Sequence, residues 1–223
     1  MNNVYVTGAS EQQGKGYDYV TIKYSTTGSQ QWAARYDGPA YLNDIANELK
    51  VDGMGNVYVT GSSHGGTTKL DYTTIKYNTT GQQQWLTRYT NSPVNDTDAA
   101  TGIDIDVYGN VYVTGYSKAS GAASYDYATI KYKGADGTQM WLKREDGGLS
   151  DKAWDIKVIY KTCASGNGSY GGGNDVPCWD VFVYVSGESK LGSGNDFLTY
   201  GYGEGGNQRW FNRFNGPQNG NDA

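Results

Sequence analysis

One short phrase recurs along the chain and limits how it can fold. The sequence VYVTG occupies Val4–Gly8, Val57–Gly61 and Val111–Gly115, and the variant VYVSG occupies Val183–Gly187. The spacings are 53, 54 and 72 residues. Because the same series of segments follows each copy, the chain is one supersecondary unit repeated. We expect a single array over residues 1–223, with repeats at approximately 1–44, 45–98, 99–151 and 152–223 and an insertion at 161–179.

Each repeat contains three further segments of similar character. The aromatic runs are Tyr17–Tyr24, Asp71–Tyr77, Asp126–Tyr132 and Asp196–Tyr202; the tryptophan-led runs end at Tyr36, Tyr89, Glu145 and Phe214; the small-residue runs are Ile45–Asp52, Ala99–Asp106 and Lys152–Ile159. These runs are short, rich in β-branched and aromatic residues, and bounded by Gly, Asn and Asp, which predicts strands. The order of side chains in 71–77 assigns alternate residues to opposite faces.

Four strands in a repeat of about fifty residues is typical of a β-propeller blade. A solenoid would need a period of roughly 20–30 residues, and an immunoglobulin-like array about seven strands per repeat. The small-residue run suits the crowded innermost strand, and the tryptophan-led run suits the outermost strand. The sequence therefore predicts an all-β protein, a β-propeller of about four four-stranded blades.

The ends of the chain predict an incomplete ring. Gly38-Pro39 precedes Asp44 as Gly216-Pro217 precedes Asp222, so the chain stops where a further inner strand would begin. We expect an open or partial ring with one inner strand missing. Either the chain is part of a longer propeller or another molecule fills the gap. Open end blades expose flat apolar faces, which favours head-to-tail contacts between copies.

The pattern D-x-A-x-x-I-x-V-D-x-x-G-N-V-Y-V-T-G, followed by an aromatic strand and G-x-x-x-W, resembles the bacterial and archaeal β-propeller repeat family (SBBP-type repeats). The resemblance covers the chain except the insertion, and it implies a surface-exposed or secreted propeller without a defined catalytic site. G-x-x-x-W also resembles the tryptophan-docking repeats of quinoprotein propellers. That rival resemblance implies a quinone-dependent dehydrogenase, with calcium ligands and a cofactor-stacking tryptophan in the central funnel.

Three residue types recur at fixed places in all four repeats. They are Asp18, Asp71, Asp126 and Asp196; Trp32, Trp85, Trp141 and Trp210; and Arg35, Arg88, Arg144 and Arg213. An active site needs only one copy of its residues, so repetition favours architecture, such as an Asp–Arg pair or a turn-capping Asp. The alternative is a ligand site in each blade. We expect no catalytic residue and no enzymatic activity.

Candidate metal and cofactor sites are weak. His64, the single histidine, lies in the glycine-rich SSHGGTT and is expected in an exposed loop. The segment 104–109 begins like a calcium loop, but Tyr108 stands where a ligand oxygen is needed; we interpret it and its counterpart 50–55 as hairpin turns. The stretch 95–98 could hold a cation weakly, but is expected to be a solvated loop. We expect no metal site and no cofactor.

Cysteine content and charge bear on location and partners. Cys163 and Cys178 both lie in the insertion, where a disulfide would stabilise a long loop and indicate an extracellular or cell-surface setting; two unpaired thiols are the alternative. The net charge is −5 with no cluster of Lys and Arg, which argues against nucleic acid. The sequence contains no run of about 18 apolar residues, the length that is needed to span a membrane.

These observations predict a non-catalytic extracellular β-propeller that serves as a surface structural module or binds a protein or glycan. The alternative is a self-assembling subunit of an extracellular filament, in which a neighbour supplies the missing strand by β-augmentation. The expected partners are further copies of the chain, head to tail, or the rest of a longer propeller. A quinone-dependent dehydrogenase is a third hypothesis.

Overall fold

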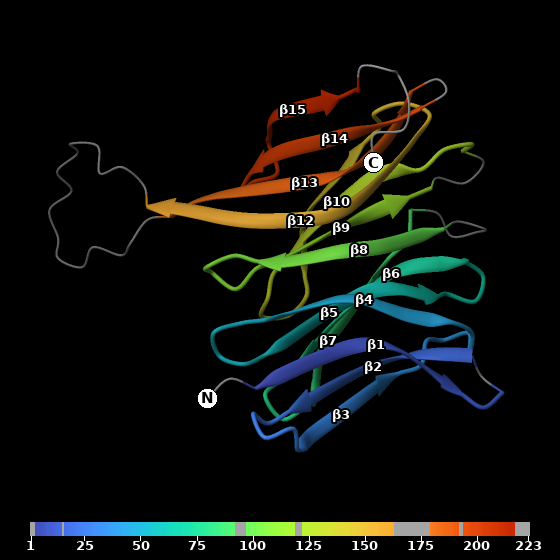
Figure 1. Cartoon of the computed structure of the whole chain (residues 1–223), viewed down its shortest axis with the longest axis vertical. Coiled ribbons are helices and arrows are strands. Elements are labelled where there is room, and N and C mark those ends of the chain that lie inside the picture. Colours follow the sequence, from blue (N-terminus) through green and yellow to red (C-terminus); the bar gives the residue numbers. More distant parts are fainter. Residues whose placement is uncertain are drawn as a thin grey trace, which may run out of the picture.

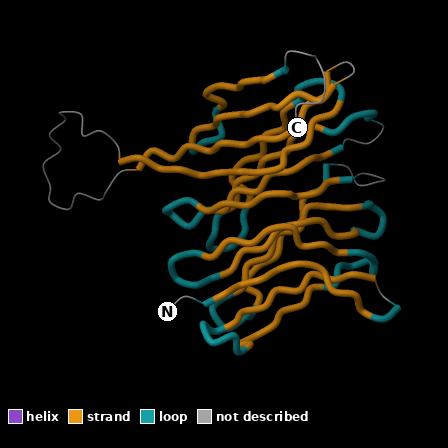
Figure 2. Tube along the Cα trace, in the orientation of Figure 1, coloured by secondary structure: helices purple, strands orange, loops and turns teal. Residues whose placement is uncertain are grey.

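The computed structural model describes residues 3–14, 16–91, 97–118, 122–162, 179–191 and 194–216. These residues contain fifteen β-strands and no helix, as Figure 2 shows. The prediction of an all-β chain is confirmed. Among the described residues there is accordingly no helix that is long and apolar enough to cross a membrane.

The strands form four antiparallel sheets in chain order, which we call blades 1 to 4. Blade 1 contains β1 (Val4–Gln12), β2 (Gly16–Tyr24) and β3 (Gln30–Tyr36); blade 2 contains β4 (Asp44–Val51), β5 (Val57–His64), β6 (Leu70–Tyr77) and β7 (Gln83–Tyr89); blade 3 contains β8 (Asp98–Ile105), β9 (Val111–Ser117), β10 (Asp126–Tyr132) and β11 (Gln139–Glu145); blade 4 contains β12 (Ser150–Thr162), β13 (Trp179–Leu191), β14 (Gly194–Gly203) and β15 (Gln208–Phe214).

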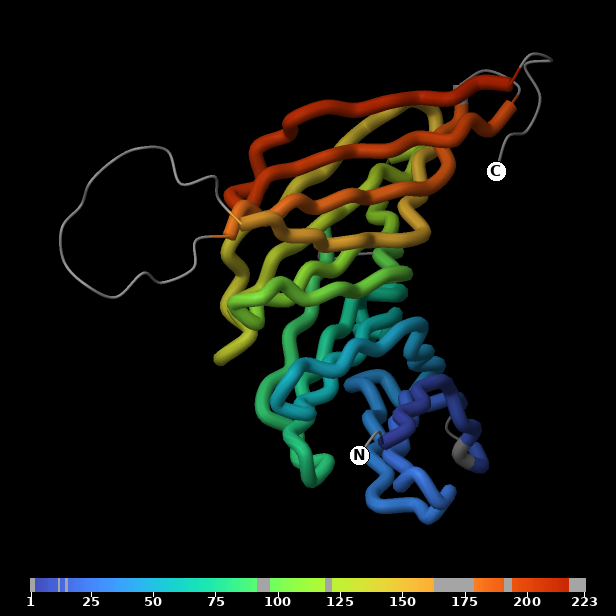
Figure 3. Tube along the Cα trace, turned by 60° about the vertical axis from the view of Figure 1, so that its left-hand side comes forward, coloured from blue at the N-terminus to red at the C-terminus, as the bar shows by residue number. Residues whose placement is uncertain are grey.

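The blades are stacked along the long axis of the molecule, from β1–β3 at one end to β12–β15 at the other (Figure 1). They follow an open arc, with blade 1 and blade 4 at opposite ends (Figure 3). Three blades have four strands and blade 1 has three, so β1 is an edge strand whereas β5, β9 and β13 are paired on both sides. The predicted propeller-like array, open and lacking one inner strand, is confirmed for the described residues.

The inner strands of blades 2 to 4 each carry a bulge opposite the repeated glycine, with register shifts at Ala46/Glu48, Ala100/Gly102 and Ala153/Asp155. A bulge leaves one residue outside the ladder. In blade 2 this residue is Asn47, whose Nδ2 donates to the Ala100 carbonyl at 2.6 Å. In blade 3 it is Thr101, whose hydroxyl donates to the Ala153 carbonyl at 2.8 Å. The bulges therefore tie each inner strand to the next.

Strand alternation gives each blade two different faces. We call the tyrosine- and tryptophan-bearing face the front face and the aliphatic face the back face. The front faces carry Tyr5, Tyr19 and Trp32; Tyr58, Tyr72 and Trp85; Tyr112, Tyr127 and Trp141; and Tyr184, Phe197 and Trp210, whereas the back faces carry Val4, Val6 and Ile22; Val57, Val59 and Ile75; Val111, Val113 and Ile130; and Val183, Val185 and Tyr200. The front face of each blade packs on the back face of the next, which makes three hydrophobic cores.

Candidate functional site

In blades 1 to 3 the tryptophan of the outer strand docks on a turn of the following blade. Trp32 Nε1 donates to the Thr79 carbonyl at 3.1 Å, Trp85 Nε1 to Gly134 at 3.1 Å, and Trp141 Nε1 to Glu204 at 2.8 Å. Each ring covers a glycine of that turn: a Cβ on Gly81, Gly137 or Gly206 would lie 2.8, 3.0 or 2.9 Å from the ring. We call this arrangement the tryptophan dock.

The same three glycines have φ values of +82°, +76° and +77°, a region that residues with a Cβ seldom adopt. Glycine is thus required at these turns by the backbone and by the ring above it. The tryptophan dock explains the spacing of G-x-x-x-W, since the glycine receives the preceding ring while the tryptophan of its own strand reaches the following blade.

Two neighbours explain the glycine of VYVTG. A Cβ at this position would collide with a backbone carbonyl of the inner strand in the same blade, which is that of Ile45, Ala99 or Lys152. The second neighbour is a tyrosine of the preceding blade. The hydroxyls of Tyr19, Tyr72 and Tyr127 donate to the carbonyls of Thr73, Ala128 and Leu198 in the following blade, at 3.3, 3.0 and 3.2 Å. Each hydroxyl also lies over the glycine of that blade: a Cβ on Gly61, Gly115 or Gly187 would lie 2.7, 2.9 or 2.7 Å from it. We call this contact the tyrosine socket. Burial raises the pKa of all three phenols above the ordinary value.

The repeated Asp and Arg form an ion pair within each blade. The distances are 2.5 Å for Arg35–Asp18, 2.7 Å for Arg88–Asp71, 2.5 Å for Arg144–Asp126 and 3.0 Å for Arg213–Asp196. Arg88 also donates to the Tyr36 hydroxyl of blade 1 at 2.9 Å, and Arg213 donates to the Gly147 carbonyl of blade 3. In these two cases the ion pair also fastens a blade to the corner of the preceding one.

Two acidic clusters at the blade corners are not predicted by the sequence. Carboxylate oxygens of Asp18, Asp37 and Asp44 lie within 4.8 Å of one another, and so do those of Asp126, Asp146 and Asp151. A cation could neutralise either group, in competition with Arg35 or Arg144. The Asp44 carboxylate already accepts from the backbone N–H groups of Gly38 at 2.5 Å and His64 at 3.0 Å. In the sequence the only signal is the recurrence of Asp at the corner loops.

Burial raises the pKa of Asp151, and the charge of Asp146 adds to this effect. Proximity of like charges and removal from water both disfavour a carboxylate.

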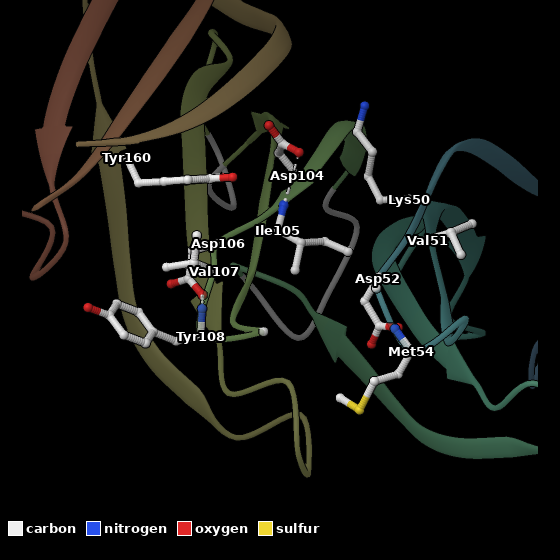
Figure 4. A pocket seen from close by; sticks show the side chains of 12 residues that line it. Lys50, Val51, Asp52, Met54, Asp104, Ile105, Asp106, Val107, Tyr108 and Tyr160 are labelled. Atoms are coloured by element: carbon white, nitrogen blue, oxygen red, sulfur yellow. Dashed lines mark hydrogen bonds between the residues drawn. The ribbon is translucent and has the colours of Figure 1, made fainter. Parts of the chain in front are cut away.

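A pocket of about 480 Å³ opens between two hairpin turns of blades 2 and 3. Figure 4 shows Lys50 at the end of β4 with Asp52 and Met54 on the turn that follows, Asp104 at the end of β8 with Asp106 and Tyr108 on the next turn, and Tyr160 of β12 above Tyr108. Tyr108 and Tyr160 are about half exposed, at 52% and 49%. The pocket therefore combines aromatic surface with carboxylates.

The acidic residues of these turns are used by the turns themselves. Asp106 Oδ1 accepts from the N–H groups of Tyr108 and Asn110, and Oδ2 accepts from the Asn110 amide and the Tyr112 hydroxyl. Asp52 caps its own turn in the same way. The structure thus places both segments in hairpin turns, in agreement with our interpretation of 50–55 and 104–109.

Charged side chains also line the inner strands beside the pocket. Burial opposes the charge on Lys50, but its hydrogen bond to Glu48, at 2.7 Å, and the nearby Asp104 and Asp155 raise its pKa. Lys157 pairs with Asp104 at 3.0 Å. Three successive inner strands carry a charged residue at equivalent positions, namely Lys50, Asp104 and Lys157. The sign of the charge therefore alternates from one inner strand to the next.

Three further predictions from the sequence concern His64, the two cysteines and the segment 95–98. His64 is half-buried at the end of β5, paired in register with Leu70, so the expectation of an exposed loop residue is wrong. The ladder extends further than the glycine-rich sequence indicates. Cys163 and Cys178 lie outside the described residues, as do residues 95 and 96. Asp98 is buried and accepts from the Asn91 N–H at 2.9 Å, so this end of 95–98 belongs to a blade corner.

Comparison with models of known protein families found no match, and no curated protein matched the sequence. The SBBP-type resemblance and the quinoprotein resemblance therefore stay predictions. What the structure establishes is the role of the repeated tryptophans in packing: Trp32, Trp85 and Trp141 dock on neighbouring blades, on outer strands.

Proposed function

We propose that the protein is a non-catalytic propeller-type module at the cell surface or outside the cell, with a structural or ligand-binding role. The observation that supports it most is the use of the repeated residues. Asp, Arg, Tyr and Trp of successive blades are engaged in ion pairs and blade-to-blade contacts. Because the repeated side chains are engaged in packing, the chain is suited to a role in which it holds a surface in place.

The pocket between the turns of blades 2 and 3 is the surface we propose for a protein or glycan ligand. Concave sites with aromatic walls and a few polar groups are common binding sites. Screening the 223-residue chain on a glycan array tests this directly. We expect binding that Tyr160→Ala reduces and Tyr17→Ala leaves unchanged, because Tyr17 is similarly exposed, at 44%, but lies on blade 1. Equal loss in both variants, or no binding, would count against the pocket.

The proposed extracellular setting depends on Cys163 and Cys178. A disulfide between them predicts that neither cysteine of the protein isolated under oxidising conditions reacts with an alkylating reagent before reduction, and that both react after it. Full labelling without reduction would remove this support for an extracellular location.

A second candidate function, assembly into filaments, is favoured by the two ends of the arc. β1 is an open edge of a three-stranded sheet, and open edges accept strands from other molecules. The outward faces of blades 1 and 4 are apolar and exposed. Light scattering of the purified chain over a concentration series tests it: growth in mass with concentration is expected, and a constant monomer mass would contradict assembly.

A further inference from the structure

The two ends of the array present opposite halves of the interface that the molecule makes three times internally. On the front face of blade 4, Trp210 and Phe197 are both 43% exposed, whereas Trp85 is 8% and Tyr72 is 0% exposed. On the back face of blade 1, Val4 and Val6 are 53% and 49% exposed, whereas their counterparts in the other blades are all buried at 0%. One end thus carries the projecting aromatic residues and the other carries the surface that receives them.

The receiving half of the tryptophan dock is preformed on blade 1, whereas the Trp210 ring lies against its own blade. Trp210 lies 5.7 Å from the Tyr184 ring at an interplanar angle of 38°, against 5.8 Å and 64° for Trp141 and Tyr112. The Trp210 ring also covers Gly201, where a Cβ would lie 2.5 Å from it. Gly28 has a φ of +81°, close to the +82° of Gly81, and its turn closes with the same Gly N–H to carbonyl hydrogen bond at 3.0 Å. A Cβ on Gly28 would meet no atom within 4 Å, unlike one on Gly81, Gly137 or Gly206. Gly28 is therefore a dock without its tryptophan.

The tyrosine socket is open at the same end. A Cβ on Gly8 would also meet no atom within 4 Å, because blade 1 has neither the inner strand nor the tyrosine hydroxyl that lie against the equivalent glycines of the other blades. A hollow of about 280 Å³ lies over it, lined by residues that include Val6, Gly8, Val20 and Ile22. The residue of blade 4 that corresponds to Tyr19, Tyr72 and Tyr127 is Phe197, which is exposed. Blade 1 thus has an empty tyrosine socket as well as an empty tryptophan dock. Blade 4 has an exposed ring, that of Phe197, at the position of the tyrosine that fills this socket in the other blades.

We propose that the front face of blade 4 in one copy binds the back face of blade 1 in a second copy, with the geometry of the internal interfaces. Trp210 covers Gly28 of the second copy and donates from Nε1 to its Thr26 carbonyl, which corresponds to Thr79 in blade 2. Phe197 enters the hollow over Gly8. This inference rests on the proposed assembly function and names its joint.

A second copy supplies the matching face, because the two complementary faces belong to the same chain and lie at opposite ends of an open arc (Figure 3). They cannot meet within the described array. Contacts between two different surfaces of one protein are heterologous, and they produce rings or filaments depending on whether the rotation closes.

The proposed joint has fewer hydrogen bonds than the internal interfaces. Phe197 lacks the hydroxyl that would reach the Val20 carbonyl of the second copy, as the Tyr19 hydroxyl reaches Thr73. Gly201 replaces the lysine that elsewhere donates to the docked turn, as Lys76 does to the Gly134 carbonyl at 2.7 Å. These differences suit a joint that forms and separates, and they allow a gain-of-function test.

Sedimentation velocity of the 223-residue chain over a concentration series tests the joint. The unmodified chain is expected to associate, and Trp210→Ala and Gly28→Asn should each weaken association by about tenfold or more. Gly109→Asn is the matched control, because Gly109 has a φ of +79°, a similar turn and open space around it. Phe197→Tyr should strengthen association by about five- to tenfold, since it restores one hydrogen-bond donor.

A mixture of the two disrupted variants gives the decisive result. Gly28→Asn keeps an intact front face and Trp210→Ala keeps an intact back face, so an equimolar mixture should form dimers with one good joint and no longer species. Melting curves verify that each variant is folded. A monomeric unmodified chain overturns both this joint and the assembly function. Association that neither variant weakens overturns the joint alone, and leaves assembly through another surface such as the β1 edge.

Discussion

At the scale of single residues, the repeated glycines have meanings that only neighbouring blades reveal. Gly81 lies under the Trp32 ring and Gly61 under the Tyr19 hydroxyl. The Trp32 ring belongs to the preceding blade, whereas Gly61 is also limited by the Ile45 carbonyl on the inner strand of its own blade. Gly28 meets open space, so Gly81 and Gly28 form a matched pair of a filled and an empty site.

Gly81→Ala should lower the free energy of unfolding by about 2–4 kcal/mol, because the new Cβ is strained at positive φ and collides with the Trp32 ring. Gly28→Ala has the same strain but no collision, so a loss of only about 1 kcal/mol is expected. Denaturant unfolding of dilute protein measures both. Equal losses would show that the ring contact adds nothing to the backbone requirement.

Arg88→Ala should destabilise the fold by about 3–5 kcal/mol, because the nearly buried Asp71 carboxylate, 5% exposed, would lose its cationic partner and keep the Thr68 hydroxyl as a hydrogen-bond donor. The variant also removes the hydrogen bond to Tyr36 of blade 1. In thermal unfolding, the double variant Asp71→Asn with Arg88→Ala should recover part of the loss, since no charge is then left unpaired. A single variant as stable as the unmodified chain would contradict a structural role for the pair.

Repetition along the sequence is enough to predict that Asp and Arg at these positions are structural, because a single active site would not need four copies of its residues. The residues that they contact are harder to predict. Alternation within a strand assigns Tyr72 and Tyr77 to opposite faces but does not say which neighbouring blade each face meets. The acidic corner formed by Asp18, Asp37 and Asp44 joins residues of two blades, so no pattern within one repeat could indicate it.

At the scale of strands and sheets, the sequence predicts most boundaries because turn residues delimit each run. Each tryptophan-led strand begins at the glutamine two residues before its tryptophan and ends at the predicted residue. The inner strands of blades 2 and 3 begin one residue earlier than predicted, at Asp44 and Asp98, whose side chains accept backbone hydrogen bonds at the corners. β12 is longer, and runs from Ser150 to Thr162.

Tyr72→Phe should cost about 1 kcal/mol of unfolding free energy, because it removes the buried hydroxyl that donates to the Ala128 carbonyl of blade 3. Tyr127→Phe should cost a similar amount at the next interface, and the two effects should add because the contacts are separate. Denaturant titration of the single and double variants measures this. A double loss well below the sum would indicate that the interfaces are coupled and not repeated units.

At the scale of the whole molecule, tyrosine takes the place of aliphatic residues in the cores. The chain contains 21 Tyr, and the largest fully buried side chains include Tyr19, Tyr58, Tyr72 and Tyr112. Each internal interface combines such rings with the valines of the next blade. Stability therefore depends on phenols that must remain protonated.

Alkaline pH should unfold the protein cooperatively. Burial raises the pKa of Tyr77 and of Tyr200 to about 12, so above pH about 10 the unfolded chain loses protons that the folded chain keeps. The stabilisation is complete below pH about 10 and is lost as the pH rises through the folded values, by about 1.4 kcal/mol per pH unit for each such group.

Circular dichroism and tyrosinate absorbance followed together over this range measure the effect. The part of the tyrosinate absorbance that comes from buried phenols should appear at the pH at which the strand signal is lost, and Tyr77→Phe should make the loss of stability with pH less steep. Complete ionisation of all tyrosines without loss of strand signal would contradict the account of the cores.

The open arc is what the repeated sequence could predict least directly. Four repeats and one missing strand could be inferred, but whether the ends meet depends on the angle between stacked sheets, which no residue pattern encodes. The structure leaves blade 4, which carries Trp210, and blade 1, which carries Gly28, at opposite ends of the array, and the proposed role of the molecule follows from that separation.

Electron cryomicroscopy of the assembled protein, at a resolution that shows side chains, is the most direct test that one interface serves every junction. The account predicts successive copies joined head to tail, with Trp210 of one over Gly28 of the next in the arrangement of Trp32 over Gly81. Particles that stay single, or copies joined through surfaces other than the outward faces of blades 1 and 4, would contradict it.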